Sequence, residues 1–146
     1  MIISGVLSIQ DSDSGELLSK SATRVVQSGR TSFLGLMGNI SNADHTGMTH
    51  IAIGTGSPVT VSDSDISLIE EYHRNSITSI TLPDLNTLNV VSLFNKDDCR
   101  TVITEAGIFG GSGASSDADS GTMFSHKYEN PSNYFIFIFN FYFIFR

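Results

Sequence analysis

The amino-acid sequence predicts a mainly β protein, an antiparallel β-sandwich-like single domain over residues 1–146 with one or two short helices. Its 146 residues suit one domain that buries one core. About seven short runs of alternating or β-branched residues are separated by clusters of Gly, Ser, Asp and Pro, a pattern typical of antiparallel strands and turns. One stretch alone carries the apolar spacing and the flanking residues of a substantial helix.

The first two elements are predicted to be a β-hairpin and that short helix. Residues 2–10 alternate loosely, and a polar cluster then places the hairpin tip near Ser14 and Gly15 before apolar residues return. Residues 29–37 follow with helical spacing, and Ser28 is the expected N-cap. The apolar residues expected on one side of this helix are Phe33, Leu34, Leu36 and Met37.

The middle of the chain predicts a strand and then a helical turn. Residues 49–54 form a short β-type run. In the polar stretch that follows, Asp63 or Ser64 is expected to cap a helical turn that buries Ile66 and Ile69.

The second half of the chain predicts further strands and one mobile loop. Strands are expected at residues 76–82, 87–94, 101–104, 123–128 and 134–146, with a turn at Pro83 and Asp84 between the first two. Residues 110–121 hold four Gly, four Ser and two Asp, which predicts a mobile or partner-contacting loop with few apolar anchors.

The C-terminal strand is the most unusual segment of the sequence. Odd positions of a strand share one face, and here each of them is a phenylalanine. Two interpretations follow: a central strand buried on both faces, or a strand whose face or edge is completed by a neighbouring subunit. The second is preferred because a small domain has few residues to cover both faces. The residues expected at such an interface are the odd-numbered phenylalanines Phe135, Phe137, Phe139, Phe141, Phe143 and Phe145.

Composition excludes several classes of function. Fifteen Asp and Glu against eight Lys and Arg give a net charge of −7 with no basic run, which disfavours nucleic acid and anionic membrane surfaces as partners. A single cysteine, Cys99, excludes an intramolecular disulfide and a multi-cysteine metal site, and it suggests a reducing compartment. The N-terminus lacks the pattern of a signal peptide.

No motif in the sequence predicts a catalytic, cofactor or metal site. The acidic turn that begins at Asp11 starts like a calcium loop, but the residue at its twelfth position is Ala22 rather than glutamate. The four histidines, at positions 45, 50, 73 and 126, are dispersed. No nucleophile elbow is present, and Cys99 has no histidine near it in the sequence. Glu70 and Arg74 are expected to pair on a solvated face.

Three glycines are expected to serve backbone geometry rather than ligand contact. Gly54 and Gly56 end a strand in a tight turn, where a third glycine and a following helix would be needed for a phosphate cradle. Gly107 lies in a strand-like segment, where a bulge or a close backbone approach is expected.

The order of several short segments resembles a known family. The segments are Gly-Arg-Thr-Ser-Phe-Leu at 29–34, Thr-His-Ile-Ala-Ile-Gly-Thr-Gly at 49–56, a stretch with Leu68, Glu71 and Arg74, Thr-Glu-Ala-Gly-Ile-Phe at 104–109, and Gly-Thr-Met-Phe at 121–124. They resemble the small virion structural proteins of tailed bacteriophages that are described as tail-fibre or tail-collar-like. The resemblance covers residues 5–128, and the Phe-rich end departs from it.

The resemblance implies a non-enzymatic building block, assembled in the host cytoplasm into a virion as a tail, collar, baseplate or fibre-adaptor protein. The expected partners are other virion proteins and further copies of the chain, with no small-molecule ligand and no cofactor. A capsid decoration protein and a carbohydrate- or receptor-binding β-sandwich module remain as alternatives.

Overall fold

The mainly β fold is confirmed: the described residues form nine antiparallel strands and one helix, where the sequence predicted about seven strands and one or two short helices. The computed structural model describes residues 2–40, 46–57, 60–132 and 137–146, with side chains throughout except at 129–132 and 137–143. The elements are β1 (Ile3–Asp11), β2 (Leu17–Val25), α1 (Gln27–Met37), β3 (Met48–Gly54), β4 (Glu71–Ser76), β5 (Ser79–Asp84), β6 (Thr87–Phe94), β7 (Ile103–Gly110), β8 (Thr122–Ser132) and β9 (Phe137–Phe145).

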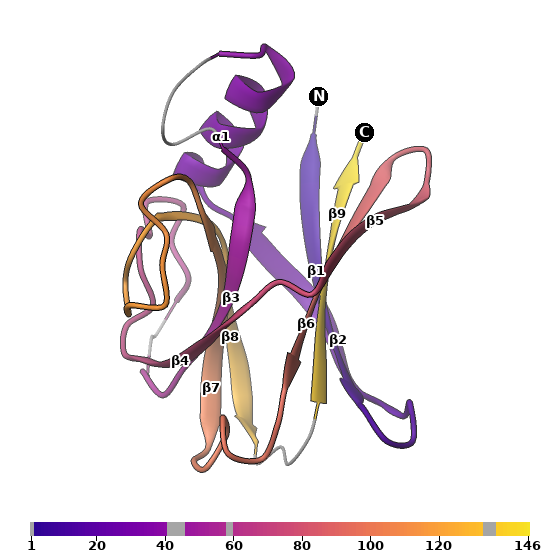
Figure 1. The fold of residues 1–146 in the computed structure, drawn as a ribbon, viewed down its shortest axis with the longest axis vertical. Helices are drawn as coiled ribbons and strands as arrows, with labels where there is room; N and C mark the ends of the chain where they lie inside the picture. Colours follow the sequence, from indigo (N-terminus) through magenta and orange to yellow (C-terminus); the bar gives the residue numbers. More distant parts are fainter. Residues whose placement is uncertain (1, 41–45, 58–59, 133–136) are drawn as a thin grey trace.

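The strands form one folded sheet in the order β4-β3-β7-β8-β2-β1-β9-β6-β5. The sheet makes two layers, because β2 leaves β1 at its C-terminal end and pairs Arg24 and Val25 with His126 and Ser125 of β8 (Figure 1). The main core lies between the layers and contains Leu7, Ile9, Val25, Phe33, Ile51, Ile53, Val90, Phe94, Cys99, Ile103, Ala106, Ile108 and Phe124.

The two outer strands of this sheet are joined by a short crossing, residues 77–78. The Ile77 N–H donates to the Thr49 carbonyl of β3, and the Thr78 N–H donates to the Val91 carbonyl of β6, both at 2.8 Å. The Ser92 hydroxyl adds a 2.9 Å bond to the Ser76 carbonyl. The chain therefore passes directly from one edge of the folded sheet to the other.

The predicted β1–β2 hairpin is confirmed. Its acidic turn is stabilised by hydrogen bonds to the side chain of Asp11, the residue that begins the turn. One carboxylate oxygen of Asp11 accepts the N–H groups of Asp13 and Ser14 at 2.9 and 2.8 Å. Gly15 completes the turn with a φ of +74°, a backbone conformation that glycine adopts without strain. Asp11 thus bonds its own backbone, as is usual for an Asx turn.

The helix is present and Phe33 is buried as predicted, but the predicted cap and the predicted burial of Leu34, Leu36 and Met37 are wrong. Val26 holds the N-cap position, and the Ser28 hydroxyl instead donates to the Met123 carbonyl at 2.7 Å. Gly29 lies so close to β8 that a Cβ there would be 2.2 Å from the Phe124 carbonyl oxygen. The helix therefore packs through Gly29 and Phe33, whereas Leu34, Leu36 and Met37 are exposed.

The Phe-rich strand β9 is a central strand of the sheet. The prediction that a neighbouring subunit completes an edge of this strand is therefore wrong. The β9 backbone pairs with β1 on one edge and with β6 on the other, so neither edge needs a neighbouring chain. The register sets Phe141 opposite Leu7 and Val90, which are both fully buried. Phe135 lies outside the described residues.

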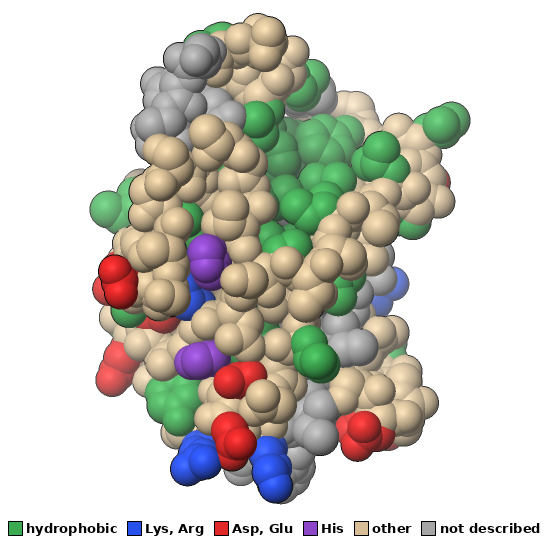
Figure 2. Space-filling model, in the orientation of Figure 1, with side chains coloured by type: hydrophobic (Ala, Val, Ile, Leu, Met, Phe, Trp, Pro, Cys, Tyr) green, Lys and Arg blue, Asp and Glu red, His purple; other side chains and the backbone are tan. Residues whose placement is uncertain are grey.

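One end of the sandwich is open and apolar. Figure 2 shows hydrophobic side chains gathered in the hollow between α1 and the β5–β6 hairpin. The partly buried hydrophobic residues that pack against the main core are Ile3, Met48, Ile77, Leu88 and Phe145. The Phe33 ring closes part of this end, since it meets the Phe124 and Phe145 rings edge to face at centroid distances of 5.3 and 5.5 Å.

We expect Phe33→Ala to lower the free energy of unfolding by about 3–5 kcal/mol, because it removes a buried ring from between two others. Leu34→Ala is the matched control on the same helix, and its exposed side chain should change stability by less than about 0.5 kcal/mol. Urea denaturation followed by circular dichroism measures both. Equal midpoints for the two variants would contradict the observed orientation of α1.

Candidate functional site

Two of the three glycines singled out in the sequence, Gly54 and Gly56, lie against one buried carboxylate, that of Glu105 on β7. A Cβ on Gly54 or Gly56 would lie 2.6 or 2.7 Å from Glu105 Oε1. A Cβ on Gly107 would lie 3.0 Å from the Ser125 carbonyl oxygen. None of the three has a positive φ, so close approach rather than a left-handed backbone makes each of them glycine.

The Glu105 carboxylate accepts hydrogen bonds from the segment that joins β3 to β4. We call this segment, residues 55–57 and 60–70, the connector. Glu105 Oε1 accepts the N–H groups of Gly56 and Glu70 at 3.3 and 2.8 Å, and Oε2 accepts that of Ile69 at 3.0 Å. A buried carboxylate is costly unless hydrogen bonds and charges compensate it. The connector supplies three such bonds through its backbone.

His126 supplies the compensating charge. Its Nε2 lies 2.9 Å from Glu105 Oε2, and its Nδ1 lies 2.8 Å from Asp65 Oδ2 of the connector. The side chains of His126 and Glu105 are fully buried, whereas that of Asp65 is 21% exposed. These three residues and the backbone donors of Gly56, Ile69 and Glu70 form what we call the Glu105 network.

A β-bulge turns His126 toward this network. Ile108 of β7 pairs with Ser125 of β8, but Phe109 pairs with Met123, so Phe124 is the extra residue. Phe124 packs into the main core, while Phe109 and Met123 belong to a second cluster under the connector.

The protonation of the network follows from its geometry. Burial opposes the charged form of each group. For His126 the bonds and charges of Glu105 and Asp65 outweigh burial and raise its pKa above the ordinary 6.5. For Glu105 the bond to His126 and the connector N–H groups outweigh burial and lower its pKa below 4.5. Between pH 4.5 and 6.5 both directions favour the charged forms, so a His126 imidazolium lies between the side chains of Glu105 and Asp65.

This arrangement positions chain segments and does not resemble a catalytic triad. A general base needs one ring nitrogen directed at a substrate or a nucleophile. Both ring nitrogens of His126 face carboxylates, and the side chain has no exposed surface. The network instead joins β7 and β8 to the connector. Arg30 of α1 fixes the connector further along, with two 2.7 Å bonds to Asp63.

The prediction of a helical turn in the connector is wrong, because bonds to other parts of the chain set its conformation. Residues 61–70 form turns and bends whose conformation is set by the bonds to Glu105, His126 and Arg30 rather than by helical hydrogen bonds. Leu68 is the residue that is buried, whereas Ile66 and Ile69 are 73% and 62% exposed.

A second buried ion pair lies on β4, where a solvated Glu70–Arg74 pair had been predicted. Arg74 bonds Glu71 instead, through Nε at 2.5 Å and Nη2 at 2.8 Å, and both side chains are at most 2% exposed. Its guanidinium carbon lies 4.5 Å from the centre of the Phe109 ring. The segment is a strand, so the helical i,i+4 spacing does not apply.

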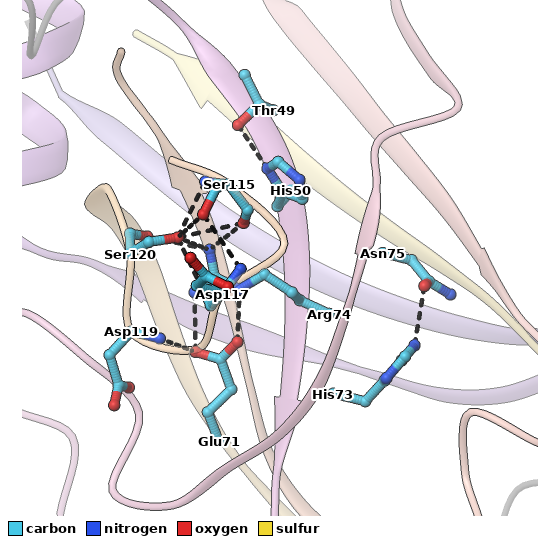
Figure 3. A network of polar contacts seen from close by, with 10 residues as sticks. All are labelled: Thr49, His50, Glu71, His73, Arg74, Asn75, Ser115, Asp117, Asp119 and Ser120. Atoms are coloured by element: carbon cyan, nitrogen blue, oxygen red, sulfur yellow. Dashed lines mark hydrogen bonds and ion pairs between the residues drawn. The ribbon is translucent and has the colours of Figure 1, made fainter. Parts of the chain in front are cut away.

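Arg74 also holds the loop at residues 110–121 (Figure 3). Its Nη1 donates to the Ser115 and Ser120 carbonyls at 3.2 and 3.0 Å. Glu71 accepts the Asp119 N–H at 2.9 Å. The loop predicted from its Gly and Ser content is thus attached through hydrogen bonds to Arg74 and Glu71 rather than through apolar contacts. Its mobility stays a prediction. We call Arg74, Glu71 and these loop contacts the Arg74 network.

The remaining candidate residues give no catalytic arrangement. Burial raises the pKa of the Cys99 thiol to about 12, so it is protonated at neutral pH and is a poor nucleophile. His73 bonds Asp98 and Asn75 at the β4 surface. His45 lies outside the described residues. Within the described ranges, no group of three His, Cys, Asp or Glu residues is placed to hold a metal ion.

Comparisons with known protein families, with curated proteins and with solved structures find no match to this chain. In the part of the chain that the structure describes, no helix combines the length and the hydropathy needed to cross a membrane.

Sequence reasoning missed both networks, although one signal was present. Glu105 stands in the run Ile-Thr-Glu-Ala-Gly-Ile-Phe, and a charge inside an apolar strand requires a buried partner. The identity of that partner could not be predicted, because His126 is 21 residues away and Asp65 is 40 residues away in the opposite direction.

The Glu105 network predicts a stability maximum between pH 4.5 and 6.5. The folded pKa of His126 is raised, so its contribution is full below 6.5 and is lost as the pH rises through the raised value. The folded pKa of Glu105 is lowered, so its contribution is full above 4.5 and is lost as the pH falls through the lowered value.

Urea midpoints measured across the pH range test this expectation. His126→Gln should lower stability by about 3–5 kcal/mol and flatten the alkaline decline, since it leaves the carboxylates without their cation. Glu105→Gln should flatten the acidic decline. The explanation fails if His126→Gln keeps the alkaline decline of the wild-type protein.

We expect Gly54→Ala to destabilise the protein by about 1–3 kcal/mol, because its new Cβ would press on the Glu105 carboxylate and on the Glu70 carbonyl. Gly113→Ala is the control, since a Cβ there meets nothing within 4 Å. Thermal unfolding of both variants measures the difference. Identical melting temperatures would show that the turn yields to a side chain.

Proposed function

We propose that this chain is a non-enzymatic structural component of a tailed-bacteriophage virion, a tail, collar, baseplate or fibre-adaptor protein that acts through protein–protein contacts. One observation carries the proposal. The segments that resemble the phage family, residues 49–56, 104–109 and 121–124 and the stretch with Leu68 and Arg74, are far apart in sequence but adjacent in the fold.

These segments supply the buried scaffold. Strands β3 and β7 pair Ile53 with Ala106 and Gly54 with Glu105. Leu68 packs with Phe109 and Met123 in the second cluster. The residues that carry the resemblance therefore explain how the domain holds together, which fits a structural subunit better than a catalyst whose recognisable residues surround a substrate.

Exposed apolar side chains on α1 and on the β5–β6 hairpin offer contact surfaces. On α1 and just after it, Leu34, Met37 and Ile40 are 57%, 63% and 59% exposed. On the β5–β6 hairpin, Leu82 and Leu85 are 73% and 106% exposed. Exposed apolar patches mark sites of protein–protein contact. A virion subunit surrounded by neighbours would cover them.

Quantitative mass spectrometry of purified particles, with an antibody against this chain for electron microscopy, tests the proposal. We expect a few to a few dozen copies per particle, labelled at the tail, collar or baseplate. Hundreds of copies spread over the shell would support the capsid decoration alternative instead. Particles without the chain, or a glycan array with specific binding, would overturn the proposed role.

Deletion with complementation sharpens the test. Particles from a deletion strain should lack a tail structure, and wild-type protein should restore it. Leu34→Glu changes an exposed residue and should leave the fold stable while it weakens incorporation. The control is Thr60→Glu, which adds the same charge at another exposed position. Normal assembly without the chain would contradict the proposal.

A further inference from the structure

The outer strand β5 is exposed on both faces and along one edge. All six of its residues are exposed, and it is the last strand in the sheet order. Among the described strands, β6 is its only partner. In Figure 1 the tip of the β5–β6 hairpin projects to the upper right, away from α1 and β3. The outer edge of β5 therefore presents backbone donors and acceptors to its surroundings.

At the opposite end of the sheet, the outer strand β4 is covered by a loop. The side chains of β4 are tied to the 110–121 loop, through the bonds of Arg74 to Ser115 and Ser120 and through that of Asp119 to Glu71. Residues of both segments line one small pocket of about 190 Å³. The loop thus lies beside β4, and the described residues provide no equivalent cover for β5.

Most of the β5 edge also lacks the charges that usually keep edge strands apart, since its one charged residue, Asp84, is the last residue of the strand. Residues 76–83 are Ser-Ile-Thr-Ser-Ile-Thr-Leu-Pro and contain no Lys, Arg, Asp or Glu. Natural proteins protect edges with charges, bulges, prolines or covering segments. In β5, Pro83 and a register irregularity between Thr81 and Asp84 both lie at the end of the strand, beside the hairpin turn. Residues 79–82 are left available for pairing.

We propose that β5 pairs antiparallel with β5 of a second copy of this chain, which joins the two sheets into one across a two-fold axis. The occupant follows from charge. The chain carries a net charge of −7, so two copies that approach through most surfaces bring carboxylates together. Two β5 edges can meet without bringing like charges together, and every copy of the chain carries the same strand.

Charge also sets the direction of the pairing. Asp84 is the first charged residue after the neutral segment. Parallel strands would place the two Asp84 side chains side by side, whereas antiparallel strands place them at opposite ends of the paired segment. Antiparallel pairing about a two-fold axis uses the same surface on both copies and closes the assembly at a dimer.

This inference does not depend on the virion role. A protein that dimerises through β5 but never enters particles would overturn the proposed function alone. A virion protein that stays monomeric in solution would overturn the dimer alone.

Analytical ultracentrifugation of the full chain over a range of concentrations tests the dimer, and we expect a reversible monomer–dimer equilibrium. Thr81→Lys sets two lysines near the two-fold axis and should weaken dimerisation at least tenfold. Thr31→Lys on α1 is the control, because it makes the same change at an exposed position away from β5. It should leave the equilibrium unchanged.

A charge-swap experiment separates a lost contact from a folding defect. Thr81→Lys and Thr81→Glu should each be monomeric alone and should form a heterodimer when mixed. Three results would overturn the inference: a monomeric wild-type protein at high concentration, a dimer indifferent to Thr81→Lys, and two folded charge variants that fail to associate when mixed.

Discussion

The structure depends on the buried carboxylate of Glu105. It accepts three backbone N–H groups of the connector and bonds the imidazole of His126, and it has no exposed surface of its own. Without it, buried connector donors would lose their acceptor, and the charge of His126 would keep only Asp65 as partner. Because each loss destabilises by roughly 1–3 kcal/mol or more, the position of the connector follows from this one side chain.

The second buried ion pair extends the same arrangement to the neighbouring strand. Arg74 joins β4 to the 110–121 loop and covers the ring of Phe109. A long connector and a long loop, neither of which has much secondary structure, are thus placed against the sheet by charged groups. Their surfaces, and the edge of β5, are what a neighbouring protein would meet under the role we propose.

Local sequence patterns predicted the strands well and the long-range contacts poorly. The β1–β2 hairpin and the strands at β3 and β6 follow from alternation and turn residues that lie within a few positions of one another. Strand β4 was missed because its polar residues resembled a solvated surface. Arg74 bonds carbonyls 41 and 46 residues away, and no local pattern encodes such a contact. The Phe-rich strand was recognised, but its partners β1 and β6 depend on the topology of the whole sheet.

The protonation of His126 tests the central claim most directly. Nitrogen-15 NMR of the imidazole reports whether each ring nitrogen carries a proton. Because both ring nitrogens face carboxylate oxygens and the pKa of His126 is raised, we expect Nδ1 and Nε2 both to be protonated in most molecules at pH 6.5, where an ordinary histidine is half neutral. Two slowly exchanging N–H signals with coupling to buried neighbours would be the expected result. A neutral ring with one N–H at that pH would contradict the account, because the two carboxylates would then lack the cation that holds them together.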